Sequence, residues 1–200
     1  MFTIGLTGGI ASGKSSVARL LGGHGARVFD ADGLAHATYA PGSPGHAAIL
    51  QAFGSGVLAA DGTIDRRALG GLVFADAAAR ARLNAIVWPL ARQRIEALKR
   101  AETEAGTAVL VIEVALLIEA GWQDLVDEVW LVRAPDAIVR ERLLERGGLD
   151  DSAAAARIAA QPDAATRVPY AAVVIDNAAD LGALARRTAE AWALLQKRLG

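Results

Sequence analysis

The 200-residue chain contains no cysteine, and this absence removes three kinds of chemistry at once. Without thiols the chain has no disulfide, no thiolate metal site and no cysteine nucleophile. Aromatic residues make up only 5% of the chain, and the formal net charge is −1 at pH 7. Such a charge balance provides no broad basic surface, so we expect no nucleic-acid partner, although a local basic pocket for phosphate remains compatible with it.

Long apolar runs are missing too. No stretch approaches the ~20 consecutive apolar residues that span a bilayer, so we expect no membrane association. Residues 1–6 lack a basic segment followed by a long apolar one, so we expect no cleaved signal peptide and a cytoplasmic location. With 53% hydrophobic residues, the chain is long enough to bury one core and short for two independent domains.

Short apolar strands alternate with helical patterns along the chain. We expect strands at residues 2–7, 27–29, 109–113, 129–132 and 173–175. Helices are expected at 15–21, 44–53, 66–73, 77–85, 89–101, 136–146, 152–160 and 181–199, with Pro89 in the first turn of its helix. Strands separated by helices pair in parallel, so the predicted fold class is α/β, with about five parallel strands flanked by helices.

The strongest motif lies at residues 8–15, which match G-x-x-x-x-G-K-S/T at every position. The motif follows a predicted strand and precedes a predicted helix. Gly8 and Gly13 permit backbone angles that other residues resist, so the loop turns its N–H groups toward a phosphate at a helix N-terminus. Lys14 supplies a charge to the β- and γ-phosphates, and the Ser15 hydroxyl is placed to bind Mg²⁺. We therefore predict a P-loop NTPase-type fold whose ATP-binding residues are Gly8, Gly9, Ile10, Ala11, Ser12, Gly13, Lys14, Ser15 and Ser16.

Two insertions interrupt the predicted core, which comprises residues 1–31, 106–135 and 171–200 of a single domain. Residues 32–105 form a long, mostly helical excursion, which we expect to bind the phosphate acceptor. Residues 136–170 are rich in arginine and alanine, and we expect them to form a helical lid.

Carboxylates follow the second and third predicted strands. Asp30 and Asp32 lie on the same side if the chain stays extended, and ligands of such sheets bind beyond the carboxyl ends of the strands. We assign Asp32 as the base that accepts the proton of an attacking hydroxyl, and Asp30 to the Mg²⁺ ion and its water shell. Alternatively, one of the two caps the next helix. Glu113 stands at a Walker-B-like position, where it either orients metal-bound water or simply ends a strand.

Arginines in both insertions are candidates for contacts with phosphate. Arg142 and Arg146 are four residues apart and share a helix face, so we expect them to close over the triphosphate, with Arg142 in a catalytic role. The alternative is a solvated face on which Glu141 and Glu145 pair with them. Arg66 is a candidate for contact with an anionic substrate, against the alternative of an ordinary surface arginine.

The order of these motifs resembles the dephospho-CoA kinase family over nearly the whole chain. The resemblance begins at residues 6–15, whose sequence is more specific to this family than the general phosphate-loop motif is. It continues through residues 30–32, 41–42, 61–66, 83–86, 116–119 and 142–149 and ends at 157–161 and 175–177. It implies transfer of the γ-phosphate of ATP, with Mg²⁺, to the ribose 3′-hydroxyl of dephospho-CoA, which gives coenzyme A in the last step of its synthesis. It also places Asp32 near that hydroxyl, and Leu116 and Glu119 in the acceptor pocket.

The chain departs from the family pattern on the acceptor and lid sides. Trp88 replaces a usual histidine, Ala115 a usual proline and Ala172 a usual aspartate, while Val139 or Arg140 stands where a glutamine is expected. Two alternatives therefore stay open, namely a P-loop kinase for another small-molecule hydroxyl or phosphate acceptor, and an ATP-binding module with little catalysis. A GTPase is disfavoured because the chain has no N-K-x-D-like motif. We expect a monomer or a weak oligomer.

Overall fold

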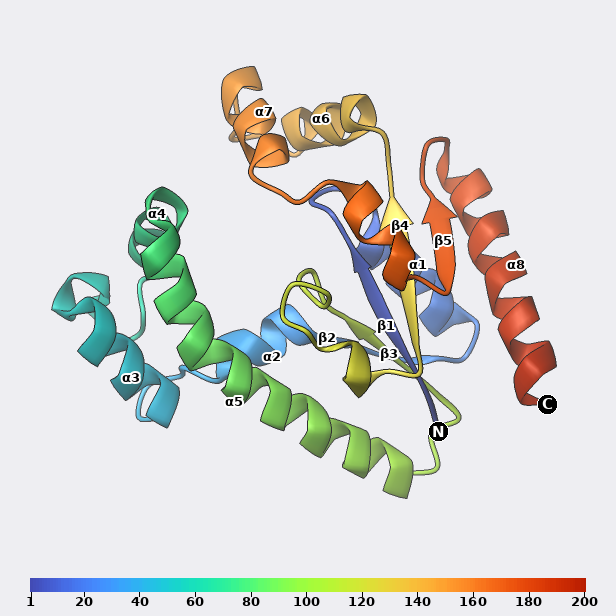
Figure 1. Cartoon of the computed structure of the whole chain (residues 1–200), viewed down its shortest axis with the longest axis horizontal. Coiled ribbons are helices and arrows are strands. Elements are labelled where there is room, and N and C mark those ends of the chain that lie inside the picture. The colour runs from blue at the N-terminus through green and yellow to red at the C-terminus, as the bar shows by residue number, and fades with distance from the viewer. The chain divides into compact units, whose positions relative to one another are not determined.

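The computed structural model describes residues 1–200, which divide into two compact units. The first unit comprises residues 1–30 and 102–200, and the second comprises residues 31–101. The first unit contains the sheet, and the second consists mainly of helices (Figure 1). Each unit has its own buried apolar cluster.

The first unit is built on one sheet of five parallel strands, which confirms the predicted fold class. The strands are β1 (Phe2–Gly8), β2 (Arg27–Asp30), β3 (Val109–Glu113), β4 (Glu128–Arg133) and β5 (Val173–Asp176). Their order is β2-β3-β1-β4-β5, so β1 lies in the middle with β3 and β4 on either side (Figure 1). The segment that leaves β1 therefore begins at the centre of the carboxyl edge, where open α/β sheets bind their ligands.

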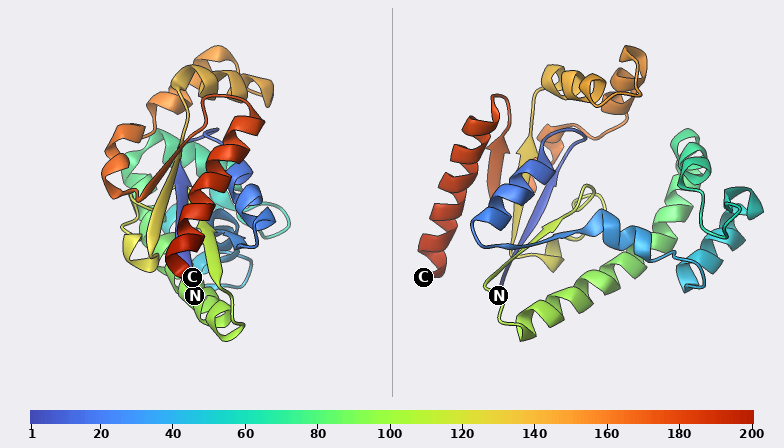
Figure 2. Two further views of the ribbon diagram at one scale, coloured as in Figure 1. Left: turned by 90° about the vertical axis from the view of Figure 1, so that its right-hand side faces the viewer. Right: turned by 180° about the vertical axis from the view of Figure 1, so that it is seen from behind.

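Both faces of the sheet are covered by other parts of the first unit. One face is covered by α1 (Lys14–Gly23) and α8 (Leu181–Leu199), which pack together on it (Figure 2). The core on this face contains Ile4, Leu6, Val17, Leu21, Val109, Val111, Trp130, Val132, Ile175, Leu184 and Leu195, all buried. On the opposite face, a Cβ at Gly5 would lie only 2.4 Å from Cδ1 of Leu117, so glycine is required where the segment after β3 approaches the strand.

The segments that link the last three strands complete the first unit. A short helix, η2 (Gln123–Leu125), precedes β4, and α6 (Asp136–Glu145) and α7 (Asp151–Ala159) follow it. The turns η3 (Ala164–Thr166) and η4 (Val168–Tyr170) then lead into β5. Asp150 caps α7 by accepting a hydrogen bond from the N–H of Ala153, which satisfies one of the free amides at the start of the helix.

The second unit consists of helices around a small apolar core. It contains α2 (Ala31–Ala37), α3 (Pro44–Phe53), η1 (Ser55–Val57), α4 (Arg66–Ala75) and most of α5 (Ala77–Glu104). Its buried residues are Ile49, Val57, Ile64, Leu69 and Val87. The side chains of Ser43 and Asp65 cap α3 and α4 by accepting backbone hydrogen bonds.

The expectation of two helices at 77–85 and 89–101 is wrong, because α5 is a single helix of 28 residues with Pro89 inside it. Proline at this position donates no backbone hydrogen bond and normally disfavours a helix interior. The helix continues because Val87, Ala91 and Ile95, spaced four residues apart, are all buried on one stripe. Pro89 itself is exposed. Burial of this stripe outweighs the local preference of proline.

Candidate functional site

The phosphate loop, residues 8–15, joins β1 to α1 at the carboxyl edge of the sheet. Its backbone has positive φ at Gly8 (153°), Ala11 (52°) and Gly13 (102°). A Cβ on Gly8 would lie 2.2 Å from the carbonyl oxygen of Val132, and one on Gly13 would lie 2.1 Å from Nδ2 of Asn177. Both positions therefore require glycine. The loop leads into the N-terminus of α1, whose unpaired N–H groups and dipole favour an anion.

Lys14 is the first residue of α1, and its side chain reaches back to the start of the loop. Its Nζ donates hydrogen bonds to the carbonyl oxygens of Gly8 at 2.8 Å and Gly9 at 3.1 Å. These contacts fix the ammonium beside the loop backbone. The arrangement places a fixed positive charge next to the amides of the loop, where a polyphosphate would need it.

The Ser15 hydroxyl meets a carboxylate from the end of β3. It donates a hydrogen bond of 2.8 Å to Oε1 of Glu113. In the parallel register of β2 and β3, Glu113 is the Cα partner of Asp30, so two carboxylates end neighbouring strands. A hydroxyl and carboxylate oxygens are the ligands that Mg²⁺ uses in phosphoryl-transfer sites, where it keeps several waters and binds few protein groups. These residues therefore fit Mg²⁺.

Asp32 does not continue β2, and the prediction that Asp30 and Asp32 share one side of an extended strand is wrong. The strand ends at Asp30, and α2 begins at Ala31. Asp32 lies in the first turn of α2, where a negative charge complements the helix dipole. Its side chain is exposed. Asp32 is therefore a residue of the first helical turn and not of a strand.

Arg142 reaches from α6 to the phosphate loop. Its Nη1 donates to the carbonyl oxygens of Ala11 at 3.3 Å and Ser12 at 3.5 Å. Its Nη2 donates to the backbone oxygen and to Oδ1 of Asn177, both at 3.2 Å. Asn177 in turn donates from Nδ2 to the oxygen of Ser12 at 2.8 Å. The guanidinium is therefore anchored to the loop backbone rather than to the glutamates of its own helix.

The two lid arginines that were expected to act together lie one helical turn apart, since the N–H of Arg146 donates to the carbonyl oxygen of Arg142 at 3.2 Å. Arg146 follows the last residue of α6, where it is the C-cap residue, and it is exposed. The neighbouring Arg140 pairs with Asp151 at the start of α7 and lowers the pKa of that carboxyl through their hydrogen bond. Arg140 thus links α6 to α7, while Arg142 links α6 to the phosphate loop.

Apolar side chains also join α6 and α7 to the loop. Ala11 is buried in one cluster with Val139, Leu143 and Ala154, and Ile10 and Ile158 pack against it. The middle of the phosphate loop therefore forms part of the same small core as the two lid helices.

Glu119 is engaged in an ion pair rather than free in solvent. Arg167, which is 2% exposed, donates to its Oε1 from Nη2 at 2.6 Å and from Nε at 2.8 Å. The pair fixes the segment before β5 to the segment after β3. Leu116, three residues earlier, is 43% exposed and presents an apolar surface.

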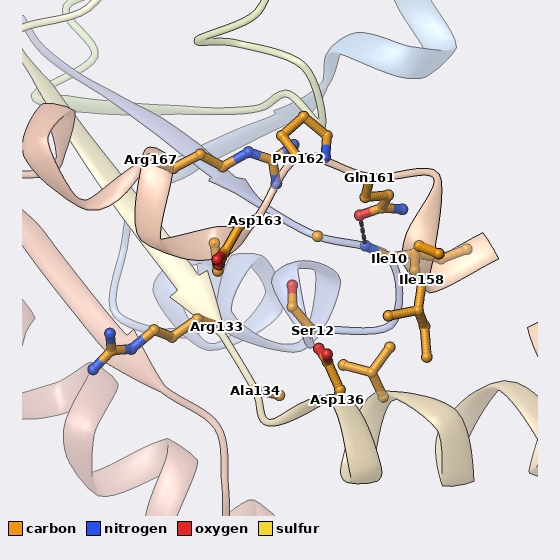
Figure 3. Close-up of a pocket in the computed structure, with 14 residues that line it drawn as sticks. Ile10, Ser12, Arg133, Ala134, Asp136, Ile158, Gln161, Pro162, Asp163 and Arg167 are labelled. Atoms are coloured by element: carbon orange, nitrogen blue, oxygen red, sulfur yellow. Dashed lines mark hydrogen bonds between the residues drawn. The ribbon is translucent and has the colours of Figure 1, made fainter. Parts of the chain in front are cut away.

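A pocket of about 340 Å³ lies beside the loop on the side of α6 and α7 (Figure 3). Arg133, Asp136, Asp163 and Arg167 contribute charged groups to its wall, and Gln161 contributes an amide. Oε1 of Gln161 accepts a hydrogen bond of 2.8 Å from the N–H of Ile10 (Figure 3). The wall thus contains both the phosphate loop and the end of α7.

In the second unit, Arg66 stands at the first position of α4 and contacts α2. Its Nη1 lies 3.3 Å from Nδ1 of His36. His36 is one helical turn after Asp32, so both residues lie on one face of α2. Tyr39 packs edge-on against the His36 ring, and burial raises the pKa of the Tyr39 hydroxyl while Arg66 partly offsets that shift.

Sequence reasoning did not assign three polar residues of the site: Gln161, Arg167 and Asn177. Each acts on a partner far away in sequence, for example Gln161 on Ile10, 151 residues earlier. No periodicity or spacing marks such contacts. Gln161 and Asn177 do belong to the segments that resemble the dephospho-CoA kinase family, and this was the available signal.

Two kinds of feature are absent from the structure. No group of three or more His, Asp or Glu side chains in the structure is arranged to hold a metal ion, so a metal here would also need ligands from a substrate. No helix is long and apolar enough to cross a membrane.

Comparison with known proteins places this geometry in context. A model of the dephospho-CoA kinase family matches residues 2–182. The chain is 48% identical over 194 residues to the dephospho-CoA kinase of Geobacter sulfurreducens, covering 96% of this chain and 98% of that protein.

Solved structures agree with the observed fold. A protein from Thermus thermophilus matches with a TM-score of 0.80 and 34% identity over 97% of both chains. The dephospho-CoA kinase from Campylobacter jejuni matches with a TM-score of 0.72, covering 98% of this chain and 97% of that one. At 24% identity, this second likeness bears on the fold alone.

Proposed function

Because the chain belongs to the dephospho-CoA kinase family, we propose that it transfers the γ-phosphate of ATP to the ribose 3′-hydroxyl of dephospho-CoA, giving ADP and coenzyme A. This is the last step of coenzyme A synthesis. The observation that carries the proposal is the phosphate loop, with Lys14 held across it and Ser15 bonded to Glu113. This arrangement supplies amides, a cation and metal ligands to a nucleotide triphosphate.

On the donor side, residues 8–16 bind the phosphates of ATP. The loop amides and the α1 N-terminus surround the β-phosphate, and Lys14 offsets charge on the β- and γ-phosphate oxygens. Arg142 braces the loop through its carbonyl oxygens. Arg146, exposed after α6, is the lid cation free to turn toward the γ-phosphate.

Ser15 and Asp30, together with Glu113, are the residues that would hold Mg²⁺. When bound, the ion neutralises charge on the β- and γ-phosphates. The hydrogen bond from Ser15 to Glu113 holds the hydroxyl and the carboxylate next to each other. Asp30 ends the neighbouring strand and would contribute to holding the ion through its water shell.

Asp32 accepts the proton of the acceptor hydroxyl. As that proton leaves, the ribose oxygen forms a bond to the γ-phosphorus, and the bond from this phosphorus to the β-γ bridging oxygen breaks, leaving its electron pair on ADP. Asp32 is exposed in the first turn of α2, and a carboxylate is a group that accepts a proton in general base catalysis. Its place on α2 allows it to contact a molecule held by the second unit.

The acceptor carries a diphosphate and a ribose, which need cationic and hydrogen-bonding partners. Arg66 is proposed to contact its anionic part, and His36, which Arg66 touches, lies one turn from Asp32. Leu116, which is 43% exposed, is proposed to provide apolar contact, and Glu119 is proposed to lie in the acceptor pocket. Movement of α6 and α7 over the bound substrates would exclude water and limit ATP hydrolysis.

The decisive test is product identification. Purified protein is incubated with ATP, Mg²⁺ and dephospho-CoA, and ADP release is coupled to detection of coenzyme A by mass. The proposal predicts one coenzyme A for each ADP. ADP formation only with other hydroxyl compounds would indicate a kinase for a different acceptor, and ATP binding without ADP formation would indicate a binding module.

The proposal also includes the location and the oligomeric state of the protein. A small enzyme of this metabolic step acts in the cytoplasm, which fractionation of cells expressing the chain would test. The protein acts as a monomer or a weak oligomer, which light scattering across a range of concentrations would test.

A further inference from the structure

The middle of the phosphate loop is a strained turn. The Ser12 N–H donates to the carbonyl oxygen of Gly9 at 3.3 Å, which places Ile10 and Ala11 at the turn's two central positions. Ala11 has a φ of 52° and is the only non-glycine residue of the chain with positive φ. An L-residue in this region meets a steric penalty that glycine does not. Other contacts must therefore hold the turn in place.

The lid segment contacts the turn on both sides of Ala11. On one side, Gln161 accepts a hydrogen bond of 2.8 Å from the Ile10 N–H (Figure 3). On the other side, Arg142 donates to the carbonyl oxygen of Ala11 at 3.3 Å. Together, the two contacts orient the Gly9–Ile10 and Ala11–Ser12 peptide groups, which lie at the two ends of the Ile10–Ala11 pair.

Packing brings Gln161 to this position. It follows α7, whose Ile158 packs on the cluster that also contains Ala11 and Val139. The Gln161 oxygen is close enough that a Cβ on Gly9 would lie 3.0 Å from it. The amide therefore fits against the loop backbone only when α7 is seated on the turn.

We propose that Gln161 is a positioning residue that holds the strained turn of the phosphate loop and so couples the seating of α7 to the affinity for the β- and γ-phosphates. Gln161 acts through the Ile10 amide and the backbone of Ala11, not by touching the nucleotide. The departure of α7 releases the turn, and the loop amides then lose their arrangement around the phosphate. This coupling deepens the proposed function, since it requires ATP as the nucleotide but does not depend on the acceptor.

Calorimetric titration with ATP tests this role without any turnover. Gln161→Met keeps the length of the side chain and removes the accepting oxygen. We expect it to raise the Kd for ATP about five- to tenfold, the usual effect of one lost hydrogen bond, while the Kd for AMP, which lacks the β- and γ-phosphates, stays unchanged. Gln196→Ala, an exposed position on α8, is the matched control and should leave both values unchanged.

A second substitution separates positioning from general damage. If Gln161 matters because Ala11 is strained, then in the Ala11→Gly background the Gln161→Met change should alter the Kd for ATP less than twofold. An unchanged Kd for ATP in Gln161→Met, an equal loss for AMP, or a full effect of Gln161→Met in the Ala11→Gly background would each overturn the proposal. Failure to form coenzyme A with normal ATP titrations would count against the proposed acceptor alone.

Discussion

The Ser15 hydroxyl donates a 2.8 Å hydrogen bond to Oε1 of Glu113, which joins the first turn of α1 to the carboxyl end of β3. Through this bond, an oxygen of the phosphate loop and an oxygen at the neighbouring strand end lie next to each other. Asp30 stands beside Glu113 in the register of β2 and β3. Phosphoryl transfer requires such a group of oxygens next to the bound triphosphate.

Glu113→Gln should weaken the affinity for Mg²⁺ more than the affinity for ATP. The amide keeps the shape of the carboxylate but loses the charge that attracts the ion and its water shell. We expect the Mg²⁺ concentration at half-maximal rate to rise about tenfold, by analogy with a weakened metal-site contact. The measurement is a Mg²⁺ titration of the rate at saturating ATP. Glu104→Gln, at an exposed position at the end of α5, is the control, and an unshifted titration in Glu113→Gln would contradict the assignment.

Asp32→Asn should lower kcat about 10²–10⁴-fold, the range that positioned proton transfer contributes, with little change in the Kd for ATP. The amide occupies the same place on α2 but accepts no proton. Steady-state rates with a parallel ATP titration separate the two effects. Turnover at the wild-type rate would remove Asp32 from the role of base.

Arg167→Met should destabilise the first unit by about 2–3 kcal/mol, because it leaves the Glu119 carboxylate without its buried partner. This loss of stability lies at or below the usual range for breaking a buried ion pair, because the Glu119 side chain is 23% exposed. Urea unfolding measures the loss. Adding Glu119→Gln to Arg167→Met should recover part of the stability, since it removes the uncompensated charge.

Arg186→Met, on the exposed face of α8, is the matched control for this pair and should be nearly neutral. If Arg167→Met proved as neutral as this control, the buried pair would contribute nothing to the fold. If the double variant were less stable than Arg167→Met alone, the loss would not come from an uncompensated carboxylate.

The ion pair between Arg198 and Glu128 gives a stability that depends on pH. The hydrogen bond from Arg198 lowers the pKa of Glu128, burial opposes that shift, and the Trp130 indole N–H adds to the lowering. A carboxyl with a lowered folded-state pKa stabilises the fold above its ordinary pKa of about 4.3. That contribution disappears as the pH falls from the ordinary value through the lowered one.

Arg198→Gln should therefore lower the free energy of unfolding only slightly at pH 7, because the arginine is 55% exposed and solvent screens the ion pair. The difference from wild type should shrink progressively below about pH 4. Unfolding curves at pH 7, 4 and 3 measure it, with Arg19→Gln on α1 as a control that should show no gap at any pH. A gap of constant size down to pH 3 would show that Glu128 is not its source.

The sheet and the donor site could be predicted because their signals are local in sequence. Five apolar strands alternate with helices, and the phosphate loop occupies eight consecutive residues between β1 and α1. The start of α2 could not be predicted, because an Asp-Ala-Asp run suits both a strand end and a helix start. The continuity of α5 through Pro89 depends on burial of Val87 and Ile95, which only the packed unit reveals.

Contacts of the lid escaped prediction for a different reason. The expectation for Arg142 and Arg146 considered the helix alone, whereas Arg142 is held by the loop and by Asn177, 35 residues later. Gln161 and Arg167 likewise find their partners across the tertiary fold. Spacing along a helix specifies which residues share a face, and it does not specify what that face meets.

Transfer of the γ-phosphate to the ribose 3′-oxygen is tested most directly by recording ³¹P NMR spectra of a mixture of protein, ATP, Mg²⁺ and dephospho-CoA. We expect the ATP signals to be replaced by those of ADP and of one new phosphomonoester on the ribose 3′-oxygen, in equal amounts. We also expect Lys14→Ala to abolish most of this conversion, by about 10²-fold or more. Release of inorganic phosphate without a new phosphomonoester, or a near-normal rate in Lys14→Ala, would contradict the proposed function.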